Sequence, residues 1–229
     1  QSRQCTESKD YDEFKKTMEL QTNSSTNTMY ADNKGNIAYW HGNFIPKRDP
    51  RFDWEKPVDG SVSVTEWQGA HSMNEIVQTH NPKQGWVQNC NSTPFSVSGF
   101  NTINQSIYPS YMASDGENFR SLLAIKEIEK ENNFTRDKLI SLGYNNYLGM
   151  FDSILPPLFK AYDALPLSDP GKQSLKEPIE VLRSWDKRSS VSSVATSLAI
   201  EWAYHFISST YFDATHDNSH DQTKIYTSL

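Results

Sequence analysis

Asparagine is distributed very unevenly along this chain of 229 residues, and that distribution constrains the fold more than any other feature. Of the 17 asparagines, 16 fall at or before Asn146 and only Asn218 lies beyond it. Asparagine favours tight turns because its side chain bonds to nearby backbone and because it tolerates left-handed conformations. The first half is therefore expected to be rich in turns, and the second half to differ in kind.

Turn signals in the first half separate runs of aromatic and β-branched residues. Such spacing is typical of hairpins, so we predict mostly β-structure over residues 27–95. A short helix is expected before it, because Tyr11, Phe14 and Met18, with Leu20, recur at helical spacing. The turn signals are NKGN at 33–36, DP at 49–50, DG at 59–60, NP at 81–82 and STP at 92–94.

Helical periodicity replaces these signals from about residue 114. Either Ser114 or Asp115 can cap a helix that runs to about Glu131, and Thr135 can cap another through Leu142. The first of these helices has one apolar face, made by Phe119, Leu122, Leu123, Ile125 and Ile128.

Three more helices are expected further along the chain. The first covers 149–163 and is interrupted by its prolines, and the second covers 172–185, where Pro178 kinks the helix or marks its start. The pattern over 191–209 is the strongest of all and predicts a helix buried on a wide face. The predicted fold class is α+β, with a hairpin-rich portion and leading helix over 1–100, a helical portion over 101–212 and a polar tail over 213–229.

Net charge and hydropathy exclude several classes of function. The formal charge is 22 − 28 = −6, which leaves no basic excess to neutralise nucleic acid or to bind an anionic membrane surface. No apolar run approaches the roughly 20 residues that cross a bilayer, and residues 1–10 are too polar for a signal peptide. We therefore expect neither nucleic acid nor a membrane among the partners.

The two cysteines are too few for a disulfide framework or a four-cysteine zinc site. Whether Cys5 and Cys90 pair with each other is left open by the sequence. Self-contained catalytic motifs are also missing, since the chain has no GxSxG, HExxH, phosphate loop or Gly-rich dinucleotide turn.

Three segments could nevertheless carry chemistry. Residues 86–94 (WVQNCNSTP) run from a strand into a turn that presents Asn89, Asn91 and Ser92, and a rigid Asn amide can donate to an oxyanion. The alternative is that these side chains only satisfy the turn backbone. Residues 27–40 form a hairpin that is purely structural by the same logic. His216 and His220 lie at i and i+4 in the tail and could bind a metal, although a solvated end is the simpler interpretation.

Several short motifs, in this order and spacing, resemble the penicillin amidase family of N-terminal-nucleophile hydrolases, which includes penicillin acylases and acyl-homoserine lactone acylases. The motifs are the hairpin NTMYADNKGNIAY at 27–39, IPKR at 45–48, DPR at 49–51, VDG at 58–60, WQG at 67–69, NPKQG at 81–85 and QNCNSTP at 88–94. The resemblance implies that the chain is part of an αββα sandwich and that its parent hydrolyses linear N-acyl amides.

The resemblance also assigns roles to two residues. Asn91 matches the family asparagine whose side-chain amide contributes to the oxyanion hole, with Gln88, Asn89 and Ser92 shaping the turn. Arg120, which follows GENF at 116–119, matches the arginine that supports this region, although an exposed surface arginine is the alternative.

No cofactor is expected to be required, but some family members bind a structural calcium. Asp115 lies near a position that supplies one carboxylate to that ion, and most other ligands would lie outside this chain. Capping of a helix by Asp115 is the competing explanation.

Catalysis in the family uses a serine, or sometimes a cysteine or threonine, that self-cleavage exposes at the start of the large subunit. Gln1 cannot take that role, so we expect an internal fragment that is inactive alone and whose partners are the small subunit and the first part of the large subunit. The small-molecule substrate would be an N-acyl amide, and family habit suggests a periplasmic or secreted enzyme. The alternative is a non-catalytic binding or interaction module derived from the same fold.

Overall fold

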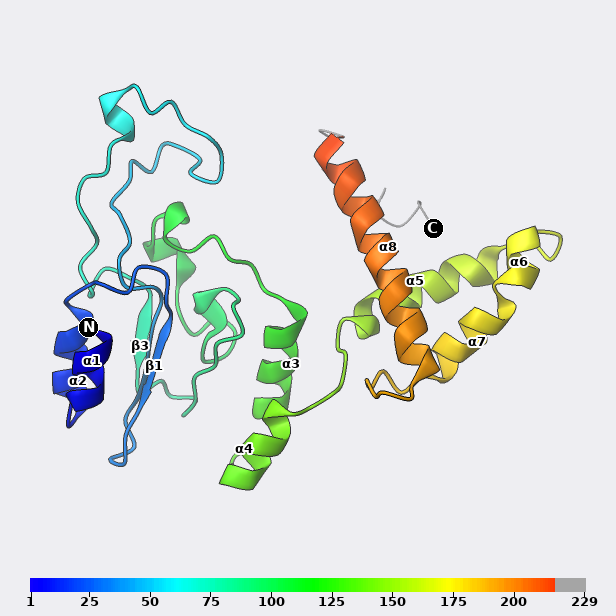
Figure 1. Cartoon of the computed structure of the whole chain (residues 1–229), viewed down its shortest axis with the longest axis horizontal. Helices are drawn as coiled ribbons and strands as arrows, with labels where there is room; N and C mark the ends of the chain where they lie inside the picture. The colour runs from blue at the N-terminus through cyan, green and yellow to red at the C-terminus, as the bar shows by residue number, and fades with distance from the viewer. Residues whose placement is uncertain (217–229) are drawn as a thin grey trace. The chain divides into compact units, whose positions relative to one another are not determined.

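The computed structural model describes the backbone of residues 1–216 and the side chains of residues 1–208. The chain divides into two compact units, Gln1–Asn132 and Asn133–Leu229 (Figure 1). Unit 1 contains helices α1 (Ser2–Glu7), α2 (Tyr11–Met18) and α3 (Phe119–Ile128), strands β1 (Thr28–Ala31), β2 (Ile37–Trp40) and β3 (Gln78–His80), and the short 3-10 segments η1 (Ser63–Thr65), η2 (Pro94–Ser96), η3 (Gln105–Ile107) and η4 (Ser110–Met112).

The three strands form an antiparallel sheet in the order β1-β2-β3. Its first turn is built on the carboxylate of Asp32, which accepts hydrogen bonds from the backbone of Lys34 and Asn36 and from the Asn36 side chain. Gly35 supplies the left-handed residue at φ 86°. The predicted hairpin over residues 27–40 and the helix before it are thus both confirmed, whereas α1 was not predicted.

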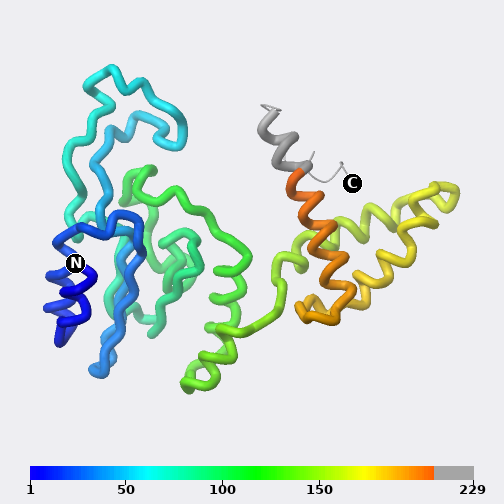
Figure 2. Tube along the Cα trace, in the orientation of Figure 1, coloured from blue at the N-terminus to red at the C-terminus, as the bar shows by residue number. Residues whose placement is uncertain are grey.

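The prediction of mostly β-structure over residues 27–95 is wrong outside these strands. Residues 41–77 and most of 81–95 are turns, loops and 3-10 segments, and Figure 2 shows the connection between β2 and β3 leaving the sheet as a long loop. Residues 45–47 pair with 68–71 through a few backbone hydrogen bonds, and side chains tie this region to the segment before β1. Buried Asn43 donates to the Met18 carbonyl and accepts from Asn23 N, while Gln21 donates to the carbonyls of Asn43 and His71.

The core of unit 1 lies between the sheet, α2 and the loops. Aromatic rings of α2 pack on the sheet, with Tyr11 stacked on His80 at 3.9 Å between ring centroids and Phe14 at 6.0 Å from Trp40. Burial of these apolar groups stabilises the short strands, which would be marginal as an isolated hairpin. The buried members are Met18, Ala38, Trp40, Met73, Ile76, Val77, Phe95 and Met112.

Helix α3 is capped by Asn118 rather than by Ser114 or Asp115. The Asn118 side chain accepts from the backbone of Arg120 and Ser121, and the Ser121 hydroxyl accepts from Asn118 N, which is a reciprocal capping box. An asparagine cap placed one residue before the first helical residue competes better than the more distant Asp115. The helix also packs through buried Ile125 within unit 1.

Unit 2 consists of helices within the residues that the structure describes. They are α4 (Arg136–Gly143), α5 (Phe151–Ala164), α6 (Pro170–Ser174), α7 (Lys176–Ser184) and α8 (Val194–His216). The predicted Thr135 cap is confirmed, because its side chain accepts from Lys138 N. Helix α5 continues through Pro156 and Pro157, contrary to prediction, and Pro178 lies in the first turn of α7, where its missing N–H costs no helical bond.

The expectation of a helix buried on a wide face over residues 191–209 is only partly met. Helix α8 occupies most of that range and extends to His216, but Val194, Ile200 and Tyr204 are exposed. Between residues 194 and 208, its buried residues are the small Ala199 and Ala203. The core of unit 2 comprises Phe151, Leu155, Leu182, Trp185, Ala199 and Ala203.

The boundary between the units falls after Asn132, whereas the sequence-based division of 1–100 from 101–212 placed it earlier. The reason is that α3 belongs with the turns of unit 1, to which Asn118 connects it. Most of the expected tail, 213–229, lies outside the described residues, and its first four residues continue α8. No helix among the described residues is long and apolar enough to cross a membrane.

Candidate functional site

Asn91 lies at the tip of an exposed turn in unit 1. Its backbone is left-handed at φ 54°, a conformation that asparagine adopts more readily than most residues. The backbone N–H of Asn91 donates to the side-chain oxygen of Asn89 at 3.2 Å. Asparagine is therefore suited to this turn, and its side chain makes no hydrogen bond within the turn itself.

Arg120 fixes the orientation of the Asn91 side chain. The guanidinium Nη2 donates to Asn91 Oδ1 at 3.4 Å. A guanidinium has donors only, so the amide must turn its oxygen towards Arg120 and its NH₂ away. Within the described part of the chain, Asn91 Nδ2 makes no hydrogen bond, which leaves two donors available at the turn.

Asn118, which sequence reasoning missed, ties this turn to helix α3. Its Nδ2 donates to the backbone carbonyls of Cys90 and Asn91, both at 3.0 Å, while its Oδ1 caps the helix. One side chain thus fixes the helix terminus and the turn together, and so places Arg120 beside Asn91. The Asn-x-x-Ser spacing of 118–121 was the signal that could have revealed the cap.

A cavity of about 320 Å³ opens beside Asn91. Asn27 connects the hairpin to the turn there, since its Oδ1 accepts from Gly42 N at 2.9 Å and its Nδ2 donates to Asn89 Oδ1 at 3.4 Å. The first strand and the Asn91 turn therefore share one wall of the cavity. Its lining residues are Ser24, Ser25, Asn27, His41, Gly42, Ile45, Asn91, Met112 and Asp115.

Burial and one exposed carboxylate set the electrostatics of the cavity. Burial lowers the pKa of His41, with the charge of Asp115 opposing that shift, so the imidazole is neutral at pH 7. Burial and the same carboxylate raise the pKa of Tyr39, whose hydroxyl lies 3.3 Å from His41 Nδ1. Burial also raises the pKa of the Cys90 thiol, against the opposing charge of Arg120. The cavity is therefore lined by a neutral imidazole and one carboxylate, and the Cys90 thiol next to Asn91 in the sequence is protonated.

The three polar residues predicted to be presented together behave differently. Asn89 and Asn91 are exposed, but Ser92 is buried, because the chain turns inwards towards η2 at this point. Gln88 is buried as well, with its side-chain amide unpartnered within the described residues. Only the two asparagines face solvent at the turn.

The structure gives no metal centre among residues 1–208, where no group of three or more His, Cys, Asp or Glu side chains gathers. Asp115 is exposed beside the cavity, so the described residues do not form a calcium site by themselves, and calcium at Asp115 stays a prediction that needs ligands from elsewhere. His216 and His220 fall outside the described side chains. Cys5 and Cys90 are free thiols.

The arrangement of these elements matches a known class of fold. The chain is similar to the solved structure of a thermostable penicillin G acylase from Alcaligenes faecalis, with a TM-score of 0.58 and 23% identity over 81% of this chain and 31% of that one. At this identity the likeness establishes a shared acylase fold, of which the chain spans about a third.

The sequence itself matches the penicillin amidase family over residues 1–227. The chain therefore belongs to the penicillin amidase family, and the resemblance found in its motifs is confirmed.

Proposed function

We propose that this chain forms part of an amidohydrolase that cleaves linear N-acyl amides, and that Asn91 donates its side-chain amide to the oxyanion of the tetrahedral intermediate. The observation that carries the proposal is the Arg120–Asn91 hydrogen bond, which turns the amide donors away from Arg120. Membership of the penicillin amidase family supports the reaction class. Donors fixed before the reaction stabilise developing charge without reorganisation, which is the main requirement for an oxyanion hole.

The nucleophile is proposed to be a serine outside this chain, exposed by self-cleavage and activated by its own α-amine. Ser24 and Ser25 line the Asn91 cavity, but neither makes a hydrogen bond to His41 or to another base among the described residues. The chain alone should then show no amide hydrolysis and no acyl-enzyme burst. Turnover by the purified chain that disappears in Ser24→Ala or Ser25→Ala would contradict this part of the proposal.

The rest of the acylase would complete the structure around this chain. We propose that it supplies a second sheet of the αββα sandwich, the small subunit and most of the substrate pocket, and that the enzyme is periplasmic or secreted. Coverage of 31% of the matched acylase supports this arrangement. The acyl group and amine of the substrate would be read mainly by residues outside this chain.

The test is substitution of Asn91 in the complete enzyme. Loss of one oxyanion donor typically costs about 100- to 1,000-fold in kcat, so Asn91→Ala should lower kcat by that order and leave KM within a few-fold. Asn91→Asp keeps the volume but places an acceptor before negative charge, and should be at least as damaging.

Self-cleavage is scored separately in both variants, because an immature precursor would also be inactive. The proposal is wrong if both variants mature, melt like the parent and retain kcat within about threefold, since Asn91 would then serve only the turn.

A further inference from the structure

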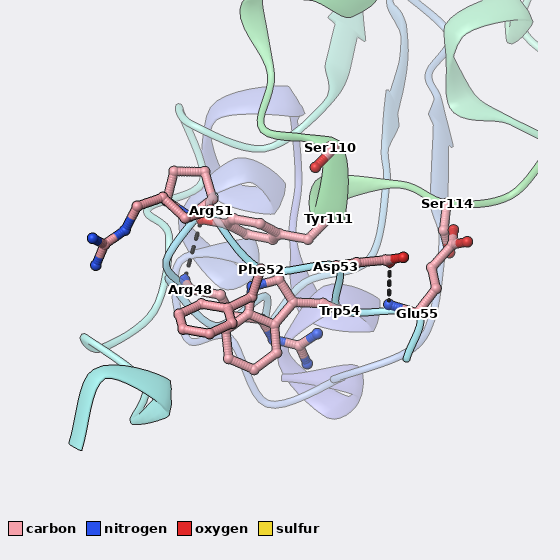
Figure 3. A pocket seen from close by; sticks show the side chains of 10 residues that line it. Arg48, Arg51, Phe52, Asp53, Trp54, Glu55, Ser110, Tyr111 and Ser114 are labelled. Atoms are coloured by element: carbon pink, nitrogen blue, oxygen red, sulfur yellow. Dashed lines mark hydrogen bonds between the residues drawn. The ribbon is translucent and has the colours of Figure 1, made fainter. Parts of the chain in front are cut away.

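A second cavity, of about 510 Å³, lies in unit 1 between the loop after β2 and segment η4. Figure 3 shows Ser110 and Tyr111 facing the loop that carries Arg48, Phe52, Trp54 and Glu55. Asn91 does not line this cavity. The cavity combines aromatic walls with cationic side chains.

Arg48 is the partly buried cation of this cavity. Its guanidinium lies 5.2 Å from the ring centroid of Trp54 and 6.0 Å from that of Trp67. Its Nε is buried without a hydrogen-bond partner, and Arg48 makes no ion pair among residues 1–208. Arg51, by contrast, pairs with Asp49 at 2.6 Å. A partly buried cation without a counter-charge is costly, and an anion would offset that cost.

The remaining contacts make the cavity rigid around Arg48. The Tyr111 hydroxyl accepts from Arg48 N at 3.2 Å and lies 3.0 Å from His71 Nε2. Trp54 Nε1 donates to the Asp49 carbonyl at 2.7 Å, which fixes the indole plane. Stacking on indoles occupies the faces of a guanidinium but leaves its two terminal nitrogens free, and those of Arg48 make no hydrogen bond among the described residues and are not fully buried. This edge, the pair of terminal nitrogens, matches a carboxylate in two parallel hydrogen bonds.

Two acidic residues also line the cavity, and they restrict which anions it can bind. Asp53 is paired with Lys56 at 2.9 Å, so its charge is offset. Glu55 makes no ion pair with Arg48 and should repel an anionic ligand. An anion with a flat apolar body suits the aromatic walls better than a compact, strongly hydrated anion does.

We propose that this cavity binds a small organic carboxylate, with the carboxylate on the edge of Arg48 and the apolar body against Phe52 and Trp54. The site is independent of the proposed hydrolysis at Asn91, because the residues that carry it do not line the Asn91 cavity.

The experiment is calorimetric titration of the 229-residue chain with benzoate, with its neutral isostere benzamide and with inorganic phosphate, while tryptophan fluorescence reports on Trp54. Benzoate should bind at least about tenfold more tightly than benzamide, because only the carboxylate accepts charge-assisted bonds from Arg48. Equal affinity for benzoate and benzamide, or tighter binding of phosphate than of benzoate, would overturn the proposal. The absence of benzoate binding up to about 10 mM, beyond the affinity of a marginal ligand, would overturn it as well.

Three variants make the test specific. Arg48→Gln should weaken benzoate binding by about tenfold or more, whereas the matched control Arg51→Gln should change it by less than about twofold, since Arg51 is already paired. Glu55→Gln should tighten binding by removing a repulsive charge. Equal losses in both arginine variants, or weaker binding in Glu55→Gln, would contradict the assignment of Arg48.

Two further variants address a folding failure of Arg48→Gln and binding of the carboxylate in the Asn91 cavity. If Arg48→Gln does not fold, Arg48→Lys keeps the charge but not the two-pronged edge, and should still weaken binding several-fold. Asn91→Ala should leave benzoate binding unchanged. Loss of binding in Asn91→Ala would show that the carboxylate occupies the Asn91 cavity instead, and would overturn this proposal without bearing on the hydrolase proposal.

Discussion

The two units of this chain are stabilised in different ways. Within the residues whose side chains are described, every buried polar side chain lies in unit 1, and the buried residues of unit 2 are aliphatic or aromatic. Unit 1 uses side chains such as Asn43, Asn118 and Asp32 to satisfy loop backbone, whereas the helices of unit 2 satisfy their own backbone and pack apolar faces. Unit 1 is therefore stabilised largely by side-chain hydrogen bonds to its turns and loops, and unit 2 by apolar packing between helices.

The same contrast shows where function is expected. Among the described residues, the buried polar atoms that lack partners also all lie in unit 1, including Arg48 Nε and both atoms of the Gln88 amide. A native protein tolerates few such atoms, because each costs about 1 to 3 kcal/mol, so each calls for a partner such as ordered water, a ligand or another polypeptide. Unit 2 contains no comparable atoms within residues 133–208.

The largest expected effect on stability is in the apolar core of unit 2. Phe151 is 1% exposed and lies 4.9 Å from Trp185 between ring centroids. Phe151→Ala should therefore reduce the free energy of unfolding of unit 2 by about 3 to 5 kcal/mol, and Phe151→Leu by clearly less. Amide hydrogen exchange is the measurement, since it reports each unit separately. Equal acceleration of exchange in α7 and in β2 would show that the two units unfold together, and would break the comparison.

The corresponding experiment in unit 1 removes a polar group. Asn43 is fully buried and bonds to Met18 O and Asn23 N, so Asn43→Ala leaves both groups unpaired and should cost about 1 to 3 kcal/mol. Asn33→Ala is the matched control, because Asn33 is exposed in the hairpin turn. Denaturant unfolding followed by tryptophan fluorescence measures both. Equal, small losses in the two variants would mean that unit 1 does not depend on its buried polar groups.

The helix caps allow a direct comparison of the two units, because Asn118 caps α3 in unit 1 and Thr135 caps α4 in unit 2. Either residue changed to alanine should lose about 0.5 to 2 kcal/mol. Only Asn118→Ala should also lower kcat of the complete enzyme, by about tenfold, because it releases the turn that carries Asn91. Equal effects of the two variants on kcat would remove the proposed link between cap and site.

The elements that sequence reasoning predicted well are those whose signals are local. The hairpin at residues 27–40, helix α2 and the Thr135 cap depend on residues within a few positions of one another. Loop structure over residues 41–77 was missed because Gln21 reaches it from elsewhere in the sequence and donates to the carbonyls of Asn43 and His71, and no periodicity records such contacts. Helix α5 likewise continued through two prolines, because Leu155 before them is buried in the core and Leu158 and Phe159 after them pack against that core.

The residues of the candidate site also divide into those that sequence motifs reveal and those that only contacts between distant segments reveal. Asn91 and Arg120 were found through motifs of the family, and the structure shows a hydrogen bond between their side chains, while the supporting role of the arginine stays a prediction. Asn118 and Asn27 were missed because each acts by joining segments that are distant in sequence. Arg48 belongs to a motif that the sequence revealed, but only the structure shows its lack of an ionic partner among the described residues.

The smallest expected effect concerns acid. Hydrogen bonds from the Asn36 side chain and nearby backbone lower the pKa of Asp32 to about 2, and two more carboxylates of unit 1, Asp49 and Glu75, are held near the same value.

A depressed pKa stabilises the folded state above the ordinary carboxyl value of about 4, and that contribution is lost as pH falls from about 4 through 2. Unit 1 should therefore lose stability in this window, and Asp32→Asn, which cannot titrate, should show a shallower decline than the parent. Hydrogen exchange of β1 and β2 amides between pH 4 and pH 2, corrected for the intrinsic pH dependence of exchange, measures the difference. Parallel curves for Asp32→Asn and the parent would mean that the Asp32 turn contributes nothing to the acid sensitivity of unit 1.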